Sequence, residues 1–437
     1  MIRFILSGLI AMLISAPVQA SVDIQEVTSP GGFEAWLVEE QSIPFTALEI
    51  RFKGGASLDP EGKRGVISLM TALIEEGAGE MDARAFTRAR DDLAASFTFD
   101  AYDDSLTVSA RFLTENRAEA VALLREALVN PRFDEDAIER VRAQTLSVIR
   151  SDANDPNAIA GHGFDEMAYE DHPYETSRKG TLESVSALTR DDIVAAHRAV
   201  LAQDRVYVGA SGDISADELG SIMDQLLGDL PEAGAPLPDE AEVHLTGGVT
   251  LIPFDTPQSV ALFGHTGIDR DDPDFFPAFV ANEIFGGAGR QSRLSDEVRE
   301  KRGLTYGVGT WIANYDYSDM LIGQFASAND RVAEGIEVIK DEWARIAEGG
   351  VTEAELEEIK TYLTGAYPLR FDGNGPIARI LVGMQIEGLT PDYITTRNDK
   401  VNAVTVEDIK RVAKWLFRPE DLRFVVVGSP DGVENVN

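Results

Sequence analysis

The chain has 437 residues, 44% of them hydrophobic, so it is long enough for two or more domains with sizeable cores. Its 39 basic and 75 acidic residues give a formal charge of −36, which argues against nucleic acid as a partner and disfavours docking on anionic lipid. It has no cysteine, which excludes disulfide bonds and thiol catalysis.

Residues 1–20 have the pattern of a secretory signal peptide. Arg3 precedes an apolar run from Phe4 to Ile14, and Val18-Gln19-Ala20 provides a small-residue ending before Ser21. The alternative, a membrane anchor, requires a longer apolar run. We therefore expect cleavage after Ala20 and a periplasmic location. No later stretch is apolar enough to insert into a membrane.

The two halves of the remaining sequence show the same order of elements. Each begins with an alternating strand, at 45–55 and at 259–267, followed by a polar loop and an apolar helix. Residues 96–113 alternate as an antiparallel hairpin does. Both halves continue with a long amphipathic helix and end on an apolar strand. A duplication is the simplest explanation of this repetition.

Proline, glycine and acidic residues cluster between the halves, at 228–248, without periodicity, as in an interdomain linker. We expect a signal peptide at 1–20, an N-terminal domain at 22–232, a linker at 233–245 and a C-terminal domain at 246–437. The predicted fold class is α+β, with two homologous domains, each an antiparallel sheet covered on one face by helices.

A search for catalytic motifs finds few candidates. No G-x-S-x-G elbow, P-loop or complete dinucleotide fingerprint occurs. Among the five histidines, no two are four residues apart, as a helical zinc site requires. His162 and Glu166 have that spacing, but one His and one Glu on a helix face are more typical of a surface contact than of a metal site.

Three stretches resemble the insulinase/pitrilysin family of zinc peptidases, the inverzincins. They are GGASLDPEGKRGVISLMTALIEEGAG, HPYETSRKGTLESVSALTRDDIVAAHRAV and, most specifically, RLSDEVREKRGLTYGVG. The resemblance extends over essentially all of the chain after the signal peptide. It implies two duplicated α+β domains that form half of a clamshell. Active members carry H-x-x-E-H on the first core helix and a further glutamate ligand on a later helix.

This chain departs from that pattern at the metal site. Ser68, Thr71 and Ala72 stand where the H-x-x-E-H residues are expected, and the later ligand position falls near Val148. These side chains do not supply imidazole or carboxylate ligands. We expect no cofactor in this chain, no catalytic residues, and no hydrolysis by the chain alone.

The resemblance also implies a substrate-binding pair, Arg299 and Tyr306, that holds the substrate backbone near the zinc site of a facing domain. Gly286, Gly287 and Gly289 are expected to turn the chain tightly before this pair. The alternative is that the basic residues here alternate with acids on a solvated helix. Arg293 and Arg302 are assigned to that structural role.

A chain that keeps the pair and lacks the metal ligands suggests a division of labour between subunits. We expect a noncatalytic, substrate-binding subunit of a heteromeric periplasmic zinc metallopeptidase, acting on peptides or small unfolded proteins. Its partner would be a homologous subunit that holds zinc through H-x-x-E-H. The acidic charge favours cationic peptides as substrates. A catalytically dead scaffold and a stand-alone peptide-binding protein remain as alternatives.

Overall fold

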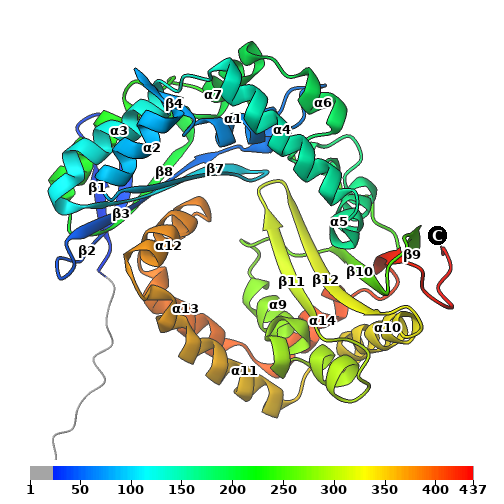
Figure 1. Ribbon diagram of the computed structural model, residues 1–437. Helices are drawn as coiled ribbons and strands as arrows, with labels where there is room; N and C mark the ends of the chain where they lie inside the picture. Colours follow the sequence, from blue (N-terminus) through cyan, green and yellow to red (C-terminus); the bar gives the residue numbers. More distant parts are fainter. Residues whose placement is uncertain (1–22, 437) are drawn as a thin grey trace, which may run out of the picture.

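The structure, a computed structural model, describes residues 23–436 and contains two main sheets (Figure 1). The predicted signal peptide lies outside the described residues. The first sheet has the strand order β1-β2-β8-β3-β7-β6. Its strands are β1 (Gln25–Thr28), β2 (Glu34–Glu39), β3 (Phe45–Lys53), β6 (Ser96–Ala101), β7 (Ser105–Leu113) and β8 (Val206–Gly212). A short separate hairpin consists of β4 (Gly77–Ala78) and β5 (Met81–Asp82).

The second sheet repeats the topology of the first. Its order is β11-β12-β10-β13-β9, which matches β6-β7-β3-β8-β2 strand by strand. The strands are β9 (Gly248–Pro253), β10 (Gln258–Thr266), β11 (Val308–Tyr315), β12 (Ser318–Ala328) and β13 (Arg423–Gly428). This match confirms the two homologous α+β domains predicted from the sequence. Pairing is antiparallel except for β2–β8 and β9–β13, which are parallel in the two sheets.

The helices also repeat in order. In the first half they are α1 (Val66–Leu73), α2 (Ala83–Asp92), α3 (Arg117–Val129), α4 (Glu135–Asp152), α5 (Pro156–Ala168), α6 (Leu182–Ala187), α7 (Arg190–Val200) and α8 (Ala216–Leu227). In the second half they are α9 (Phe275–Asn282), α10 (Val332–Gly349), α11 (Glu353–Ala366), α12 (Asn374–Ile386), α13 (Tyr393–Ala403) and α14 (Val406–Leu416). The equivalent helices α7 and α14 both begin at a Thr-x-x-Asp capping box, at Thr189 and Thr405.

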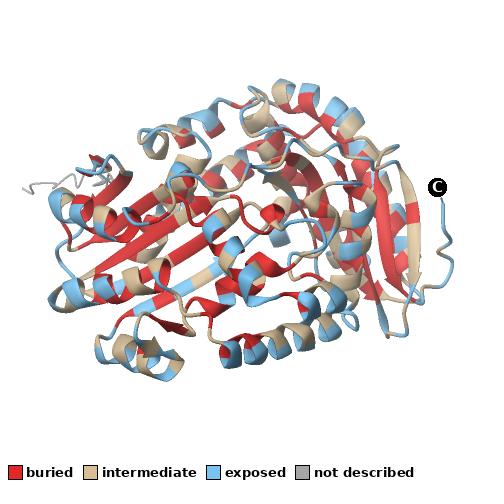
Figure 2. Cartoon of the chain, turned by 90° about the horizontal axis from the view of Figure 1, so that it is seen from above, coloured by how far each residue is buried: buried red, intermediate tan, exposed pale blue. Residues whose placement is uncertain are grey.

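Each sheet has its own core, and Figure 2 shows the buried residues concentrated along the strands. In the first half, α1, α3, α7 and α8 contribute to one cluster with residues such as Phe52 and Phe112. In the second half, Phe263, Trp343 and Phe424 belong to a second cluster with side chains of α9, α10 and α14. Full burial of one such side chain stabilises the fold by about 1.5–3 kcal/mol, so each half has a substantial core.

One helix of each half crosses to the sheet of the other half. Helix α12 packs on β3 and β8, on the side away from α2 and α3 in Figure 1, while its counterpart α5 packs on β10 and β13. Gly209 of β8 allows this approach, because a Cβ there would lie 2.6 Å from the Ala378 carbonyl oxygen. Helices thus cover one face of each sheet, as expected, and the exchanged helices cover part of the second face as well.

The segment between α8 and β9, residues 228–247, forms no helix or strand, yet it is anchored to both halves. The N–H of Ala241 donates to the Tyr317 carbonyl (2.8 Å), and that of His244 donates to the Ala168 carbonyl (3.0 Å). It therefore packs between α5 and the β11–β12 hairpin. None of the helices in the described part of the chain has the length and apolarity needed to cross a bilayer.

Candidate functional site

Helix α1, which carries the positions of the zinc motif, is held at its start by a buried carboxylate. Asp59 accepts hydrogen bonds from the N–H groups of Gly65 (2.7 Å) and Ile67 (2.9 Å). Gly65 has a φ of +93°, a conformation that favours glycine. Burial raises the pKa of Asp59 to about 6, while the guanidinium of Arg64, 3.3 Å away, opposes that rise. The start of the helix is therefore fixed.

The loop before α1 also touches the loop before α6. Arg64 donates to the carbonyl oxygen of Thr176 (2.7 Å). A Cβ on Gly65 would lie 2.5 Å from the Lys179 carbonyl oxygen, and a Cβ on Gly180 would lie 2.2 Å from that of Arg64. Two of the stretches that carry the family resemblance are thus in direct backbone contact, and the two glycines make that contact possible.

The three degenerate metal positions lie on α1 and have ordinary structural surroundings. The Ser68 hydroxyl donates to the Arg178 carbonyl oxygen (2.6 Å). The buried Thr71 hydroxyl donates to the Ile67 carbonyl oxygen one turn earlier (2.8 Å), and Ala72 is exposed. These positions offer only two hydroxyl groups, one of them bonded to its own helix, and a methyl group. They do not supply the ligands of a zinc site.

The acidic residues after α1 are held in ion pairs. Glu75 lies 2.7 Å from Arg90, and Glu76 forms a bidentate pair with Arg140 on α4. Within residues 23–436, no group of three or more His, Cys, Asp or Glu side chains is arranged to hold a metal ion, and this includes His162 and Glu166 on α5. Val148, at the expected later ligand position, is an exposed residue of α4.

The three glycines of the predicted loop have two different roles. Helix α9 continues into a π-helical turn at Glu283–Gly287. A Cβ on Gly286 would lie 2.3 Å from the Thr310 hydroxyl on β11, and one on Gly287 would lie 2.7 Å from the Glu283 carboxylate. Gly289 has open space around it and a φ of +60°. The first two glycines permit close packing, and the third turns the chain.

Most basic residues of the following stretch are held in ion pairs. Arg293 forms a bidentate pair with Glu355 of α11, with distances of 2.5 and 2.8 Å. Lys301 and Arg302 each lie 2.6 Å from Glu297. Arg302 thus pairs with an acid of the same stretch, as the solvated-helix interpretation expected, whereas Arg293 pairs with an acid of a different helix.

Arg299 lies at the end of a second π-helical turn, Ser295–Glu300, and differs from these neighbours. Its guanidinium pairs only with the adjacent carboxylate of Glu300 at 3.0 Å among the described residues, and Glu300 is 58% exposed. Exposed pairs of this kind contribute about 0–1 kcal/mol, so a ligand can replace the carboxylate at little cost.

Tyr306 projects into solvent from an anchored loop. Its exposure is 91%, whereas Leu304, two residues before it, is buried. The Thr305 hydroxyl donates to the Ala326 carbonyl oxygen (2.6 Å) on β12 and accepts from the N–H of Gly307 (3.1 Å). The flanking backbone is therefore fixed while the phenol makes no contribution to the core. A large side chain held outward in this way is available to contact another molecule.

Sequence reasoning missed a second concentration of positive charge. Arg370, Arg379 and Arg397 line a cavity of about 800 Å³ next to β11. They lie on the short 3₁₀ turn η8 (Tyr367–Phe371), on α12 and on α13. Because only the fold brings these elements together, no local pattern in the sequence could have signalled the cavity.

Two family models match the chain. The model described as insulinase (peptidase family M16) matches residues 36–181, and the model described as peptidase M16 inactive domain matches residues 187–363. The non-peptidase homolog YmxG of Helicobacter pylori is 24% identical over 392 residues, which is 90% of each chain. The uncharacterized zinc protease YmxG of Bacillus subtilis is 22% identical over 94% of this chain and 99% of its own length.

Solved structures agree with this assignment. A peptidase M16 inactive domain from Pseudomonas fluorescens is 26% identical and superposes with a TM-score of 0.86, over 95% of this chain and 100% of that one. A protease from Helicobacter pylori, 16% identical over 93% of this chain and 99% of its own, has the same fold with a TM-score of 0.83. As the three resembling stretches implied, the chain belongs to the insulinase (peptidase M16) family.

Proposed function

We propose that this chain is the noncatalytic, substrate-binding subunit of a heteromeric periplasmic zinc metallopeptidase that acts on peptides or small unfolded proteins. The observation that carries the proposal is the contrast between Tyr306 and Ser68. The phenol of Tyr306 is 91% exposed on an anchored loop, whereas the zinc motif, which begins at Ser68, has no imidazole or carboxylate left. The expected substrate-binding tyrosine is thus exposed, while the expected metal-ligand positions carry no metal-binding side chain.

Arg299 and Tyr306 have chemistry suited to a peptide. A guanidinium offers several fixed N–H donors to peptide carbonyl oxygens. A phenol donates a hydrogen bond to the oxyanion that develops when water attacks such a carbonyl. The partner's zinc would activate that water, because a bound divalent ion lowers its pKa. This chain would then orient the peptide and stabilise charge, while the chemistry of the metal stays on the partner.

The experiment combines this chain with a homologous chain that carries H-x-x-E-H and measures cleavage of a fluorogenic peptide. Each chain is assayed alone and in the mixture. Arg299→Gln and Tyr306→Phe are compared with Arg302→Gln, a nearby arginine held by Glu297. We expect activity only in the mixture, a loss of about a hundredfold for Tyr306→Phe, which is typical of removing one oxyanion donor, and a loss for Arg299→Gln because it removes charged donors to the peptide carbonyl oxygens.

The outcomes separate the proposal from its alternatives. Cleavage by this chain alone, blocked by a chelator, would contradict a noncatalytic role. A mixture that forms and cleaves equally well with Tyr306→Phe and Arg299→Gln would make the chain a scaffold. Peptide binding without any activity in the mixture would leave a stand-alone binding protein. Full retention by Arg302→Gln is required for the loss to be assigned to the pair.

A further inference from the structure

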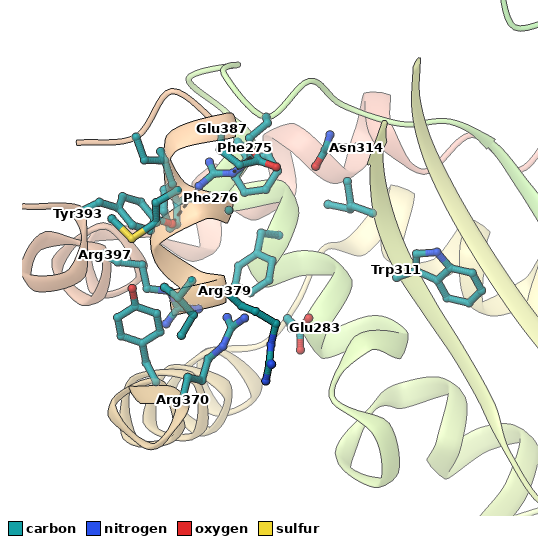
Figure 3. A pocket seen from close by; sticks show the side chains of 18 of the residues that line it. Phe275, Phe276, Glu283, Trp311, Asn314, Arg370, Arg379, Glu387, Tyr393 and Arg397 are labelled. Atoms are coloured by element: carbon teal, nitrogen blue, oxygen red, sulfur yellow. Dashed lines mark hydrogen bonds and ion pairs between the residues drawn. The ribbon is translucent and has the colours of Figure 1, made fainter. Parts of the chain in front are cut away.

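The cavity of about 800 Å³ lies in the second half, between the end of α9, strand β11, the turn η8, and helices α12 and α13 (Figure 3). Its charged lining consists of four cations and two carboxylates, Arg270, Arg370, Arg379, Arg397, Glu283 and Glu387. The chain as a whole has a formal charge of −36, so an excess of cations around one cavity runs against its composition.

One of the four arginines is part of the wall. Arg270 lies 3.6 Å from the Glu387 carboxylate and donates to the Tyr393 hydroxyl (2.9 Å). Its guanidinium also lies over the Phe275 ring, 4.2 Å from the centroid. The Arg270 guanidinium is thus already in contact with a carboxylate, a phenol and an aromatic ring. Arg270 and Glu387 neutralise each other and form part of the cavity wall.

Arg397 is a buried cation without a carboxylate partner in the described part of the chain. It is 7% exposed and donates to the Leu363 carbonyl oxygen (3.1 Å). Its guanidinium lies 4.6 Å from the centroid of the Tyr367 ring. Burial lowers the pKa of Arg397, and nearby Arg370 adds repulsion, but an arginine stays charged in proteins. Its positive charge therefore acts on the cavity across a medium that screens poorly.

Arg370 and Arg379 are exposed and converge on the cavity from η8 and α12, with Glu283 facing them from the end of α9 (Figure 3). Between residues 23 and 436, neither guanidinium has a carboxylate within 4.0 Å or a hydrogen-bond acceptor. Burial raises the pKa of the Glu283 carboxyl, and nearby Arg397 opposes that rise. Two guanidinium groups without an ion-pair partner among the described residues thus face a hollow with aromatic walls beside a buried cation, and Arg379 also acts at longer range on the Glu49 carboxylate.

We propose that this cavity binds the carboxylate groups of an acidic peptide. Guanidinium forks match carboxylates in a bidentate geometry, and Arg370 and Arg379 are free to supply it. The cavity reaches β11, whose outer edge is unpaired in the described sheet and can bond a peptide backbone. This inference names the peptide class of the subunit proposed above and so rests on that proposal. It replaces the expectation of cationic peptides, which rested on the net charge of the whole chain. A bound peptide interacts most strongly with the charged side chains next to it.

The test measures binding of peptides to the purified chain by calorimetry. A short Glu-rich peptide, acetylated and amidated at its ends, is compared with its Gln counterpart, and the Gln peptide is also used with a free C-terminal carboxylate. Arg370→Gln and Arg379→Gln are compared with Arg198→Gln, an exposed arginine of α7 far from the cavity in sequence. We expect the Glu peptide to bind at least about tenfold more tightly than the amidated Gln peptide, with a similar loss for each cavity variant.

Each result has a defined meaning. Tight binding of the Gln peptide only when its C-terminus is free identifies the terminal carboxylate as the ligand, and tight binding of the Glu peptide identifies side chains. Equal affinity of all three peptides, or equal affinity of the cavity variants and Arg198→Gln, overturns the inference and leaves the proposed subunit role intact. Absence of binding overturns it as well. The subunit role itself is tested separately: it fails if this chain alone cleaves peptides, or if the mixture with the H-x-x-E-H chain is inactive or indifferent to Arg299 and Tyr306.

Discussion

The guanidinium of Arg64 lies 3.3 Å from the carboxylate of Asp59, and the two side chains are 13% and 1% exposed. The same carboxylate accepts the first N–H groups of α1. A buried pair of this kind has a small net worth, yet removing one partner is costly because the other charge stays buried. The start of the helix that carries Ser68, Thr71 and Ala72 is therefore held by interactions that do not involve metal.

The substitution Arg64→Gln should lower the free energy of unfolding by about 3 kcal/mol, since it strands the Asp59 carboxylate in the interior. Arg140→Gln is the control, because Arg140 is 47% exposed in its pair with Glu76 and should cost at most about 1 kcal/mol. Urea unfolding of both variants measures the difference. Equal effects would show that the Asp59–Arg64 pair does not hold α1.

Removal of metal should leave this chain unchanged. Ser68, Thr71 and Ala72 offer two hydroxyl groups and a methyl group, and a ligand that binds only the folded state raises the midpoint of unfolding. We expect the same thermal midpoint with zinc, without zinc and with a chelator, and zinc far below one equivalent by elemental analysis. A midpoint that rises with zinc concentration would reveal a site that the described residues do not suggest.

The strands were predictable because alternation of polar and apolar residues reports which side chains face a core. Residues 96–113 form the hairpin β6–β7, and the strand expected at 259–267 is β10, Gln258–Thr266. The two-domain repeat followed from comparing the halves. The lost zinc motif and the Arg299–Tyr306 pair were recognised from residue identity and spacing, and the functional roles given to them stay predictions.

The rest could not be predicted, because it depends on contacts between distant segments. The apolar faces of α5 and α12 show that each helix is buried, but not that each lies on the sheet of the other half. The parallel pairs β2–β8 and β9–β13 leave no trace in alternation. Arg370, Arg379 and Arg397 lie on three elements, so their convergence appears only when the chain is folded.

The packing of α12 on the sheet of the other half can be tested by a substitution at one residue, Gly209. Gly209→Ala would place a Cβ 2.6 Å from the Ala378 carbonyl oxygen and force α12 away from β8. Because a backbone atom cannot yield as a flexible side chain does, we expect a loss of about 1–3 kcal/mol. Gly383→Ala, on α12 itself, meets open space and should stabilise by up to about 1 kcal/mol. Thermal unfolding of the two variants should therefore shift in opposite directions, and a neutral Gly209→Ala would contradict the close contact.

The contribution of Asp165 on α5 to stability should fall as pH rises from about 4 to about 7. Burial raises the pKa of Asp165 to about 7, and the nearby charge of Asp103 adds to the rise. An Asp side chain in the unfolded chain has a pKa of about 4, so the folded chain binds the proton of Asp165 more tightly. The contribution is fully present below about pH 4 and is lost as pH rises toward 7. The carboxyl groups of Asp59 and Asp104, whose pKa values burial raises to about 6, act in the same direction.

Asp165→Asn removes the buried charge and should therefore stabilise the chain at pH 8 by about 1 kcal/mol, after allowance for partial solvent screening, with little effect at pH 4. Asp155→Ala, at the start of the same helix, is the control of opposite sign. Hydrogen bonds from Asn157 lower the pKa of Asp155, so its loss should destabilise at pH 8 and matter less in acid. Urea unfolding of both variants at pH 8 and pH 4 measures these effects. If the two variants change stability in the same direction with pH, Asp165 does not keep its proton in the folded chain.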